Sequence, residues 1–591
     1  MAEYSPEPQI TVLDAGGQYC HLIARKVREL GVYADVRPSD TPACELRSRK
    51  GVIISGGPSS VYAPGAPQAD PDLFYSGVPV LGICYGQQLM AHLMDGAVRT
   101  GDKGEYGFAI LEREPAPLFE GLPEGPQQVW MSHRDQVERP PSGFSVIGRT
   151  SACPIAAIGD PARRLYGVQF HPEVVHTCYG REILANFVLR ICGCRADWNP
   201  MHRIPMLLDG IRETAGNRNI FFFVSGGVDS SVAFTLCVRA LGAERVRGIY
   251  VDTGLMRAGE TEFVRAAFEE LAPGAVMLES AEERFLGALA GIRDPEEKRR
   301  IIGEQFVRVQ EQIIESGHFL EGDWILGQGT IYPDTIESGG TAKAAVIKTH
   351  HNRVPGIQRL IELGRIVEPL TSFYKDEVRE IGAGLGLPAE LLARHPFPGP
   401  GLAIRCLCSE TSEPVRETAH GFIVPVHSVG VQGDERSYRP VLAIEGLPGP
   451  GEELHAAATE LINQLPGINR VVALVDSKAP LASLRTVPCD LSRERLERLR
   501  KADAVVRRLS RESGFDDRIW QFPVILLPVG AAGGESVVLR PVDSIDGMTA
   551  RSVPMGPELL TRMCRELMAI DGVSAVFYDL THKPPATIEW E

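Results

Sequence analysis

The stretch that most constrains this chain is 221–231, FFFVSGGVDSS. It begins as a continuous apolar run, which is typical of a strand buried on both faces of a parallel sheet. Gly226 and Gly227 then allow the backbone to turn tightly and to approach a ligand closely. Asp229 to Ser231 open a helical pattern, so free backbone N–H groups and the positive end of the helix dipole favour an anion in the loop. The loop is not a Walker A motif, because no lysine closes it, and an ordinary strand–turn–helix is the alternative interpretation.

The string Ser-Gly-Gly-Val-Asp-Ser-Ser at 225–231 resembles the pyrophosphate loop of N-type ATP pyrophosphatases, enzymes that cleave ATP to AMP and pyrophosphate. The resemblance implies ATP with Mg²⁺ as co-substrate, Asp229 holding the metal against the pyrophosphate, and no organic prosthetic group. Asp252, which closes the next strand in YVDTGLMR, would border the adenosine, although taken alone it also suits a turn or a cap. The implied ATP-binding residues are Ser225, Gly226, Gly227, Val228, Asp229, Ser230, Ser231 and Asp252.

Length and charge limit the other interpretations. A chain of 591 residues is too long for one core and predicts about four domains. The net charge of −15, from 61 basic and 76 acidic residues, argues against nucleic acid or an anionic membrane as a partner. No apolar run approaches the length of a membrane span, and the start MAEYSPEPQ lacks the features of a signal peptide. The 12 cysteines form no zinc motif. These features predict a cytoplasmic enzyme with reduced thiols that acts on small molecules.

Residues 9–192 alternate short apolar runs with helical stretches, which predicts an α/β domain with a mainly parallel sheet. Cys84 lies in GICYG (82–86), between the strand VPVLG and the helix QQLMAHLM. Small residues on both sides allow a strained turn that projects the thiol beside a backbone N–H, and the helix N-terminus favours the thiolate. His171 and Glu173 follow the strand LYGVQF and can point the same way, so that the carboxylate orients the imidazole as a base.

These motifs resemble class I glutamine amidotransferases from residue 9 to about 192. The resemblance implies Cys84 as the nucleophile on the glutamine carboxamide, His171 as its base and Glu173 as the acid that orients this base. The backbone N–H groups of Gly57 and Tyr85 would form the oxyanion hole, and the side chain of Gln88 would contact the bound glutamine. One departure is Arg134 in Ser-His-Arg-Asp (132–135), where the family has glycine, and it leaves the conformation of that loop open.

A linker is expected at 193–205, followed by an adenine-nucleotide alpha-hydrolase-like ATP pyrophosphatase (synthetase) domain at 206–395. The motifs QGTIYPD (328–334), KTHHN (348–352), HPFPGPG (395–401) and KPPATIEWE (583–591) resemble the glutamine-hydrolysing GMP synthetase family, and the likeness extends over the whole chain. The resemblance implies a carbon–nitrogen ligase that hydrolyses glutamine to ammonia, adenylates xanthosine monophosphate (XMP) with ATP, and aminates it to GMP with release of AMP and pyrophosphate. Arg299 would bind XMP. The candidates to balance phosphate charge are Lys348, Lys375 and Arg405.

Residues 396–591 form a longer region than the single small dimerisation domain of this family requires, and the region resembles itself. FIVPVHSVGV (422–431) is similar to FPVILLPVGA (522–531), and LPGINRVVALVDSKAP (465–480) is similar to IDGVSAVFYDLTHKPP (570–585). We therefore expect an α+β C-terminal region in two copies, 396–490 and 491–591, with an amphipathic helix at 491–514. This is the eukaryotic-type arrangement of the family.

The family resemblance also implies an XMP site shared by the two copies and the synthetase domain. Its residues would be Arg299, Asp434, Gln521, Lys583 and Glu589. Pairing of the two copies inside one chain favours a monomer, with a homodimer as the alternative, because each copy can bury the apolar face of the other.

Two other interpretations remain open. Another glutamine-dependent ATP pyrophosphatase, such as an NAD-synthetase-like ligase, would share the loop, but that class usually carries a nitrilase-type glutaminase. A catalytically silent nucleotide sensor would be expected to have lost Cys84, Asp229 or Lys583, and all three are present.

Overall fold

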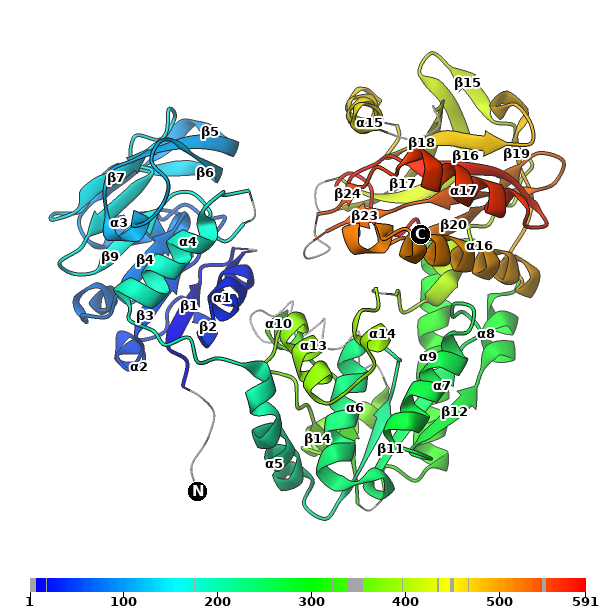
Figure 1. Cartoon of the computed structure of the whole chain (residues 1–591), viewed down its shortest axis with the longest axis horizontal. Coiled ribbons are helices and arrows are strands. Elements are labelled where there is room, and N and C mark those ends of the chain that lie inside the picture. Colours follow the sequence, from blue (N-terminus) through cyan, green and yellow to red (C-terminus); the bar gives the residue numbers. More distant parts are fainter. Residues whose placement is uncertain are drawn as a thin grey trace. The chain divides into compact units, whose positions relative to one another are not determined.

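The structure is a computed structural model that describes residues 7–17, 19–174, 176–321, 323–337, 354–395, 397–432, 435–446, 451–465, 467–544 and 549–591. The chain forms two compact units, residues 1–206 and 207–591 (Figure 1). Within the described ranges, no helix is both long and apolar enough to cross a membrane.

The first unit is built on a mixed sheet of nine strands in the order β2-β1-β3-β4-β9-β8-β7-β5-β6. The first five of these pair in parallel, and the other four continue the sheet in antiparallel fashion. The strands are β1 Ile10–Asp14, β2 Ala34–Pro38, β3 Gly51–Ile54, β4 Val80–Ile83, β5 Ala97–Arg113, β6 Gln127–Arg139, β7 Ser145–Arg149, β8 Ala157–Asp160 and β9 Leu165–Val168. The helices are α1 Cys20–Glu29, α2 Ala43–Leu46, α3 Tyr85–Leu93 and α4 Gly180–Ala185.

The parallel part of this sheet positions the predicted amidotransferase residues. Strands β3, β4 and β9 are buried at every residue, as expected for strands with both faces covered. Because the carboxyl ends of parallel strands meet at one edge of the sheet, the segments that follow these strands converge there. They carry Gly57, Cys84 and His171.

The second unit contains a parallel sheet of five strands in the order β12-β11-β10-β13-β14. The strands are β10 Asn219–Phe223, β11 Val246–Asp252, β12 Val276–Ser280, β13 Trp324–Gly327 and β14 Ile366–Val367. The chain runs outward from β10 to β12 and then returns to the other side of β10. This reversal makes the carboxyl ends of β10 and β13 a topological switch point, where ligands bind in open α/β sheets.

Helices connect and flank these strands. They are α5 Ile204–Ala215, α6 Val228–Leu241, α7 Glu260–Leu271, α8 Glu282–Leu289, α9 Pro295–Ser316, α10 Tyr332–Glu337, α12 Pro355–Glu362, α13 Lys375–Gly384 and α14 Ala389–Leu392. The predicted strand, turn and helix at 221–231 are present as β10, the connecting loop and the start of α6.

The C-terminal region forms a sheet of seven strands in the order β15-β16-β17-β18-β25-β22-β20. The strands are β15 Arg416–Thr418, β16 Gly421–Gln432, β17 Glu435–Glu445, β18 Arg470–Ser477, β20 Val524–Leu527, β22 Glu535–Leu539 and β25 Val573–Asp579. Short strand pairs are β19 Arg485–Thr486 with β21 Val529–Gly530, and β23 Val542–Asp543 with β24 Arg551–Ser552. The helices are α15 Glu452–Gln464, α16 Arg493–Glu512 and α17 Pro557–Met568.

One connection pattern occurs twice in this sheet. An antiparallel pair, β16–β17, is followed by α15 and by β18 parallel to β17; likewise the antiparallel pair β20–β22 is followed by α17 and by β25 parallel to β22. The two halves meet where β18 and β25 pair in antiparallel fashion. The charged helix expected at 491–514 is α16, capped by Ser492, whose side chain accepts a hydrogen bond from Arg495 N.

The apolar core of the second unit crosses residue 395. A single cluster contains Phe285 of α8 and Ile302 of α9 together with Leu499 and Val506 of α16 and Met563 of α17. The C-terminal region and the synthetase region therefore share a core, and the predicted boundaries at 395–396 and 490–491 remain predictions.

Candidate active sites

Cys84 lies at a strained turn between β4 and α3. Its φ of 52° and ψ of −105° place a non-glycine residue in the left-handed half of conformational space. A Cβ at Gly82 would lie 2.5 Å from the main chain of Gly86, and one at Gly86 would lie 2.3 Å from Ile54 O. The turn therefore requires glycine on both sides of the nucleophile, as the motif GICYG predicts.

His171 and Glu173 form a buried pair beside this turn. Their side chains are joined by a contact of 2.7 Å between His171 Nδ1 and Glu173 Oε1, and the residues are 4% and 1% exposed. Burial lowers the pKa of His171, but the charge of Glu173 and hydrogen bonds to Cys84 and Glu173 outweigh it and hold this pKa well above 6.5. The structure thus brings the three predicted triad residues together.

Polar groups from three segments lie around the Cys84 sulfur. Gln169 Nε2 donates to Cys84 Sγ at 3.5 Å, and the thiol itself lies 3.7 Å from its acceptor Ser132 O. Gln88 Nε2 donates to Asp135 O at 2.7 Å and to Gln169 Oε1 at 3.3 Å. Gln88 is therefore buried beside the nucleophile, and its contact with a glutamine substrate stays a prediction.

The predicted oxyanion-hole residues adjoin one another. A Cβ at Gly57 would lie 2.4 Å from Ala15 O and 3.4 Å from Tyr85 Cγ, so only glycine fits between these two segments. The preceding Ser55 accepts a hydrogen bond from Ala15 N at 3.0 Å, which fixes the segment after β3 against the segment after β1.

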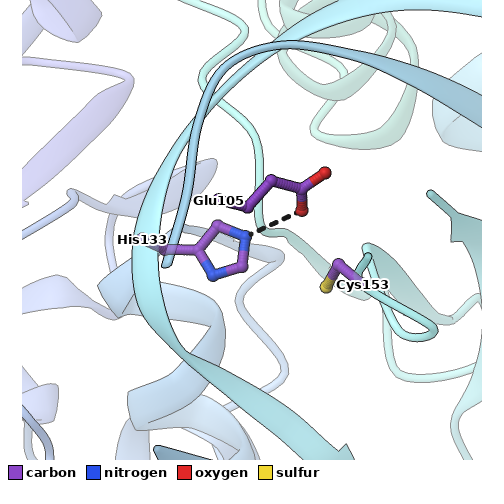
Figure 2. A group of neighbouring side chains, drawn as sticks. All are labelled: Glu105, His133 and Cys153. Carbon is purple, nitrogen blue, oxygen red and sulfur yellow. Dashed lines mark hydrogen bonds and ion pairs between the residues drawn. The ribbon is translucent and has the colours of Figure 1, made fainter. Parts of the chain in front are cut away.

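A second polar group lies next to Cys84. Figure 2 shows Glu105, His133 and Cys153, whose ligand atoms lie within 4.8 Å of one another. His133 contacts Glu105 Oε2 at 3.3 Å through Nε2 and Asp135 O at 3.0 Å through Nδ1. Burial raises the pKa of the Cys153 thiol to about 12, so the thiol stays protonated at neutral pH. This donor set could hold a metal ion, but its own hydrogen bonds already tie the β5 and β6 strands together.

The position of residue 134 in β6 explains why arginine is tolerated where the family has glycine. Ser132, His133, Arg134 and Asp135 lie within β6, and the Arg134 side chain is exposed. A bulky cation is therefore accommodated without disturbing Cys84 or His171.

The predicted pyrophosphate loop connects β10 with α6 at the switch point of the second sheet. Gly226 has a φ of 69°, a value that favours glycine, and Arg394 Nη1 donates to Gly226 O at 2.8 Å. Gly227 N donates to Ser225 Oγ at 3.2 Å, and Ser225 Oγ lies 3.0 Å from Ser230 Oγ. These bonds hold an open loop at the N-terminus of a helix of 14 residues.

The Asp229 side chain forms an ion pair with Lys375. Lys375 Nζ, at the start of α13, donates to Asp229 Oδ2 at 2.9 Å. The other oxygen, Oδ1, is buried and has no hydrogen-bond partner among the described residues. A carboxylate oxygen left in this way suits an Mg²⁺ ligand, because Mg²⁺ prefers oxygen donors.

A cavity of about 660 Å³ opens over the loop. It extends from Ser225 and Asp229 past Gln328 to Arg394 and Phe397. Its volume is in the range of small-molecule sites.

Asp252 has a structural role at the border of this cavity. Its two oxygens accept hydrogen bonds from Gly254 N and Thr261 Oγ1, both at 2.9 Å. Its neighbours Val251 and Thr253 line the cavity. The geometry thus matches a turn residue at the cavity border, and a direct contact with adenosine stays a prediction.

Two residues predicted for XMP, Arg299 and Gln521, and the phosphate candidate Arg405 carry buried polar atoms without a partner in the described part of the chain. These atoms are Arg299 Nε, Arg405 Nη1 and Gln521 Oε1. Arg405 also forms two bonds with Glu589, from Nε at 2.9 Å and from Nη2 at 2.6 Å. Lys583 is half-buried, and its main chain pairs with Ala550. Asp434 and Lys348 lie outside the described residues.

The structure also identifies residues that sequence reasoning missed. Gln169 lies two positions before His171, so its proximity to the motif was a usable signal. Arg394, whose burial lowers its pKa to about 10, precedes the HPFPGPG motif and lines the cavity. Lys298 is fully buried and pairs with Glu591 at 2.7 Å. No sequence motif links these two residues, so the contact could not be predicted.

Comparison with known proteins identifies the families of the regions that carry the two candidate sites. Family models match residues 11–191 (Glutamine amidotransferase class-I), 202–273 (NAD synthase) and 509–590 (GMP synthase C terminal domain). These matches confirm the predicted fold class. They define a glutamine-dependent ligase with an amidotransferase part and an ATP pyrophosphatase part.

Similar proteins narrow this class to one family. The "Probable GMP synthase (glutamine-hydrolyzing)" of Leptospira interrogans is 40% identical over 602 residues, covering 99% of each chain. The "GMP synthase (glutamine-hydrolyzing)" of Caldicellulosiruptor saccharolyticus is 41% identical, covering 98% of this chain and 99% of its own. A solved GMP synthase subunit from Thermoplasma acidophilum, itself described as putative, is 33% identical over 31% of this chain and 93% of its own, with a TM-score of 0.28. The chain belongs to the glutamine-hydrolysing GMP synthase family.

Proposed function

We propose that this chain converts XMP to GMP with nitrogen taken from glutamine and energy taken from ATP. The observation that carries the proposal is a set of unpartnered polar atoms on residues predicted for the nucleotides. Asp229 Oδ1, Arg299 Nε, Arg405 Nη1 and Gln521 Oε1 are all buried without a hydrogen-bond partner in the described ranges. Unsatisfied buried groups are costly, so bound substrates and a metal would satisfy them.

In the amidotransferase half, Cys84 would act as the nucleophile on the glutamine carboxamide. Its sulfur bonds to the amide carbon, and backbone N–H groups of Gly57 and Tyr85 stabilise the developing oxyanion. His171, held by Glu173, gives a proton to the departing ammonia and then takes one from the water that hydrolyses the thioester to glutamate.

In the synthetase half, the 2-oxygen of XMP would attack the α-phosphorus of ATP, and pyrophosphate would leave into the 225–231 loop. Ammonia then attacks carbon 2 of the base and displaces AMP, which leaves GMP. When bound, Mg²⁺ would neutralise phosphate charge, with Asp229 as its ligand. Lys375, next to Asp229, would add a second positive charge beside the pyrophosphate.

The C-terminal region supports an internal duplication. The connection pattern of β16, β17, α15 and β18 is repeated by β20, β22, α17 and β25, and the matching model covers only the second set. The two full-length relatives named above are bacterial, which favours a bacterial type over the eukaryotic-type arrangement expected from the sequence. We infer a duplicated region in a monomer, and a cytoplasmic location.

The test is ATP-dependent formation of GMP from XMP by the purified chain, once with glutamine and once with ammonium. We expect one AMP and one pyrophosphate for each GMP with either nitrogen source, and one glutamate when glutamine is used. Glutamine hydrolysis without any XMP-dependent formation of AMP would contradict the proposal.

A further inference from the structure

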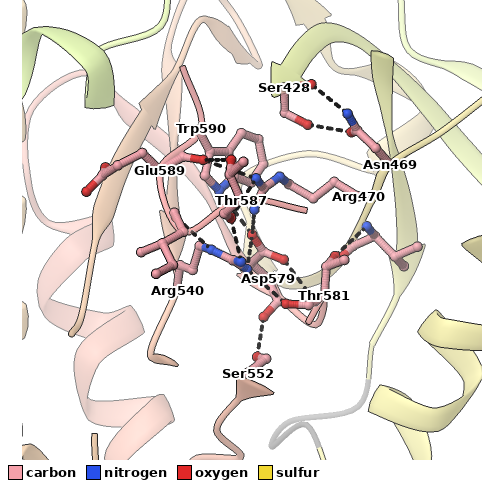
Figure 3. Close-up of polar contacts among 12 residues, drawn as sticks. Ser428, Asn469, Arg470, Arg540, Ser552, Asp579, Thr581, Thr587, Glu589 and Trp590 are labelled. Atoms are coloured by element: carbon pink, nitrogen blue, oxygen red, sulfur yellow. Dashed lines mark hydrogen bonds and ion pairs between the residues drawn. The ribbon is translucent and has the colours of Figure 1, made fainter. Parts of the chain in front are cut away.

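A buried ionic cluster lies under the last residues of the chain (Figure 3). Asp579, at the end of β25, contacts two arginines through Oδ2: Arg470 Nη1 at 2.5 Å and Arg540 Nη1 at 2.8 Å. Trp590 Nε1 donates to the same oxygen at 3.0 Å, and Arg470 Cζ lies 4.6 Å from the centre of the Trp590 ring. The four residues are 0% exposed. Two guanidinium groups share one carboxylate here, and buried charges of this kind need further hydrogen bonds from their remaining donors.

Several of the other donors bind the main chain of the segment 587–589, whereas Arg470 Nε is buried without a partner in the described ranges. Arg470 Nη2 donates to Thr587 O at 3.1 Å and to Glu589 O at 3.3 Å. Arg540 donates to Thr587 O at 2.7 Å through Nη2 and to Ile588 O at 2.9 Å through Nε. These hydrogen bonds from two buried guanidinium groups therefore fix the path of this segment.

The fixed segment presents the side chain of Glu589. Both oxygens of this carboxylate bind Arg405, at 2.6 and 2.9 Å. Arg405 is 0% exposed, and its Nη1 has no partner in the described ranges. The position of segment 587–589 thus sets the orientation of the buried Arg405 guanidinium, and with it the direction of its unpartnered Nη1.

We propose that Arg470 is a positioning residue of the XMP site, which holds Glu589 and, through it, Arg405 in place. Arg470 begins β18, in the first half of the repeat, whereas Glu589 and Asp579 belong to the second half. The first half therefore contributes to the site independently of Asp434. The inference rests on the proposed function. Burial lowers the pKa of Arg470 to about 10, so the residue remains charged at neutral pH.

The test replaces Arg470 by lysine, which keeps the charge but replaces the planar fork, with Nη1 on Asp579 and Nη2 on the carbonyls, by a single nitrogen. We expect the KM for XMP to rise by about tenfold or more, the equivalent of one charged hydrogen bond. The KM for ATP and the rate of glutamine hydrolysis should not change. A general structural defect would lower kcat for all substrates and would not produce this selective rise.

The matched control is Arg365→Lys in the same unit. Arg365 also donates to main-chain carbonyls, those of Trp324 and Leu320, but it is remote in sequence from the 587–589 segment. This variant should keep the wild-type KM for XMP.

The outcomes separate the two levels of the inference. A wild-type chain without XMP-dependent AMP formation overturns the proposed function before any variant is made. A folded Arg470→Lys variant with the wild-type KM for XMP overturns the positioning role alone. If that variant does not fold, Arg540→Lys is measured in the same way, and failure of both to fold shows that the cluster is structural and overturns the inference.

Discussion

At the residue scale, the amidotransferase chemistry depends on a conformation that its neighbours enforce. The positive φ of Cys84 is an unfavourable backbone state that persists because Gly82 and Gly86 let other main-chain segments approach closely. The thiol is thereby held beside His171, whose pair with Glu173 is buried. The spacing of the motifs made these residues predictable, since the strained turn needs small residues at fixed positions.

Cys84→Ala should abolish glutamine-dependent synthesis and leave ammonium-dependent synthesis intact, because the thiolate serves only the hydrolysis of the amide. GMP formation is measured with each nitrogen source, with thermal unfolding as the control for the fold. A folded variant that also fails with saturating ammonium would show that the two chemistries are not separate.

Glu173→Gln should lower the pKa of His171. The folded-state pKa of His171 lies above the 6.5 of an unfolded chain, so the imidazolium stabilises the fold fully below pH 6.5. This contribution is lost as pH rises through the folded-state pKa. Without the charge of Glu173, we expect the pKa to fall, as measured by NMR titration of the imidazole. An unchanged titration would mean that Glu173 does not set the protonation of His171.

Asp229→Asn should stop synthesis with glutamine and with ammonium alike, because a neutral amide is a poorer Mg²⁺ ligand than a carboxylate. The variant should also require a higher Mg²⁺ concentration for half-maximal activity, while glutamine hydrolysis in the other unit continues. Normal ammonium-dependent turnover at the wild-type Mg²⁺ requirement would exclude this role.

At the element scale, local sequence patterns were sufficient to predict individual strands and helices, but not the contacts between residues far apart in the sequence. The strand and helix around 225–231 and the charged helix α16 followed from apolar periodicity and capping residues. The bond between Arg405 and Glu589 joins residues 184 positions apart, and that between Arg470 and Asp579 joins residues 109 apart. No local pattern encodes such pairs, because they depend on how β18, β25 and the last segment come together in the sheet. The sequence also left two interpretations of Asp252 open, a residue that borders adenosine or a turn residue, and the structure shows its two oxygens accepting hydrogen bonds from Gly254 and Thr261.

Gly329→Ala should damage the synthetase site through the element that follows β13. A Cβ at residue 329 would lie 2.8 Å from the main chain of Asp229 and Ser230, so the two loops must move apart. We expect ammonium-dependent synthesis to fall by about a hundredfold, the usual cost of misplacing reacting groups by an ångström.

The control for this variant is Gly287→Ala in α8. A Cβ there would meet nothing within 4 Å, and alanine favours the helix, so activity should be kept and stability slightly raised. Equal activity of the two variants would show that the approach of the loops is unimportant.

At the scale of the whole molecule, the register of β18 and β25 supports the proposed internal duplication of the C-terminal region. The repeat expected from the sequence relates residues 105 positions apart, as in Lys478 and Lys583. In the pairing of β18 with β25, Ala473 lies opposite its own equivalent, Tyr578. The pair Val472 and Asp579 is likewise related to the pair Leu474 and Phe577. A two-fold axis through an antiparallel strand pair produces this register, as in isologous interfaces between separate subunits.

We therefore expect the chain to be a monomer in solution. The strand edge that a second subunit would occupy in a symmetric pair is already filled, since β18 lies between β17 and β25, and β25 lies between β18 and β22. The apolar face of each half is buried against a shared core, so little is left to drive association through this sheet. Light scattering at micromolar concentration, with and without XMP and ATP, should give the mass of one chain, 64.4 kDa. A stable mass of twice that value in both conditions would contradict internal pairing and would assign the dimer contact to another surface of the protein.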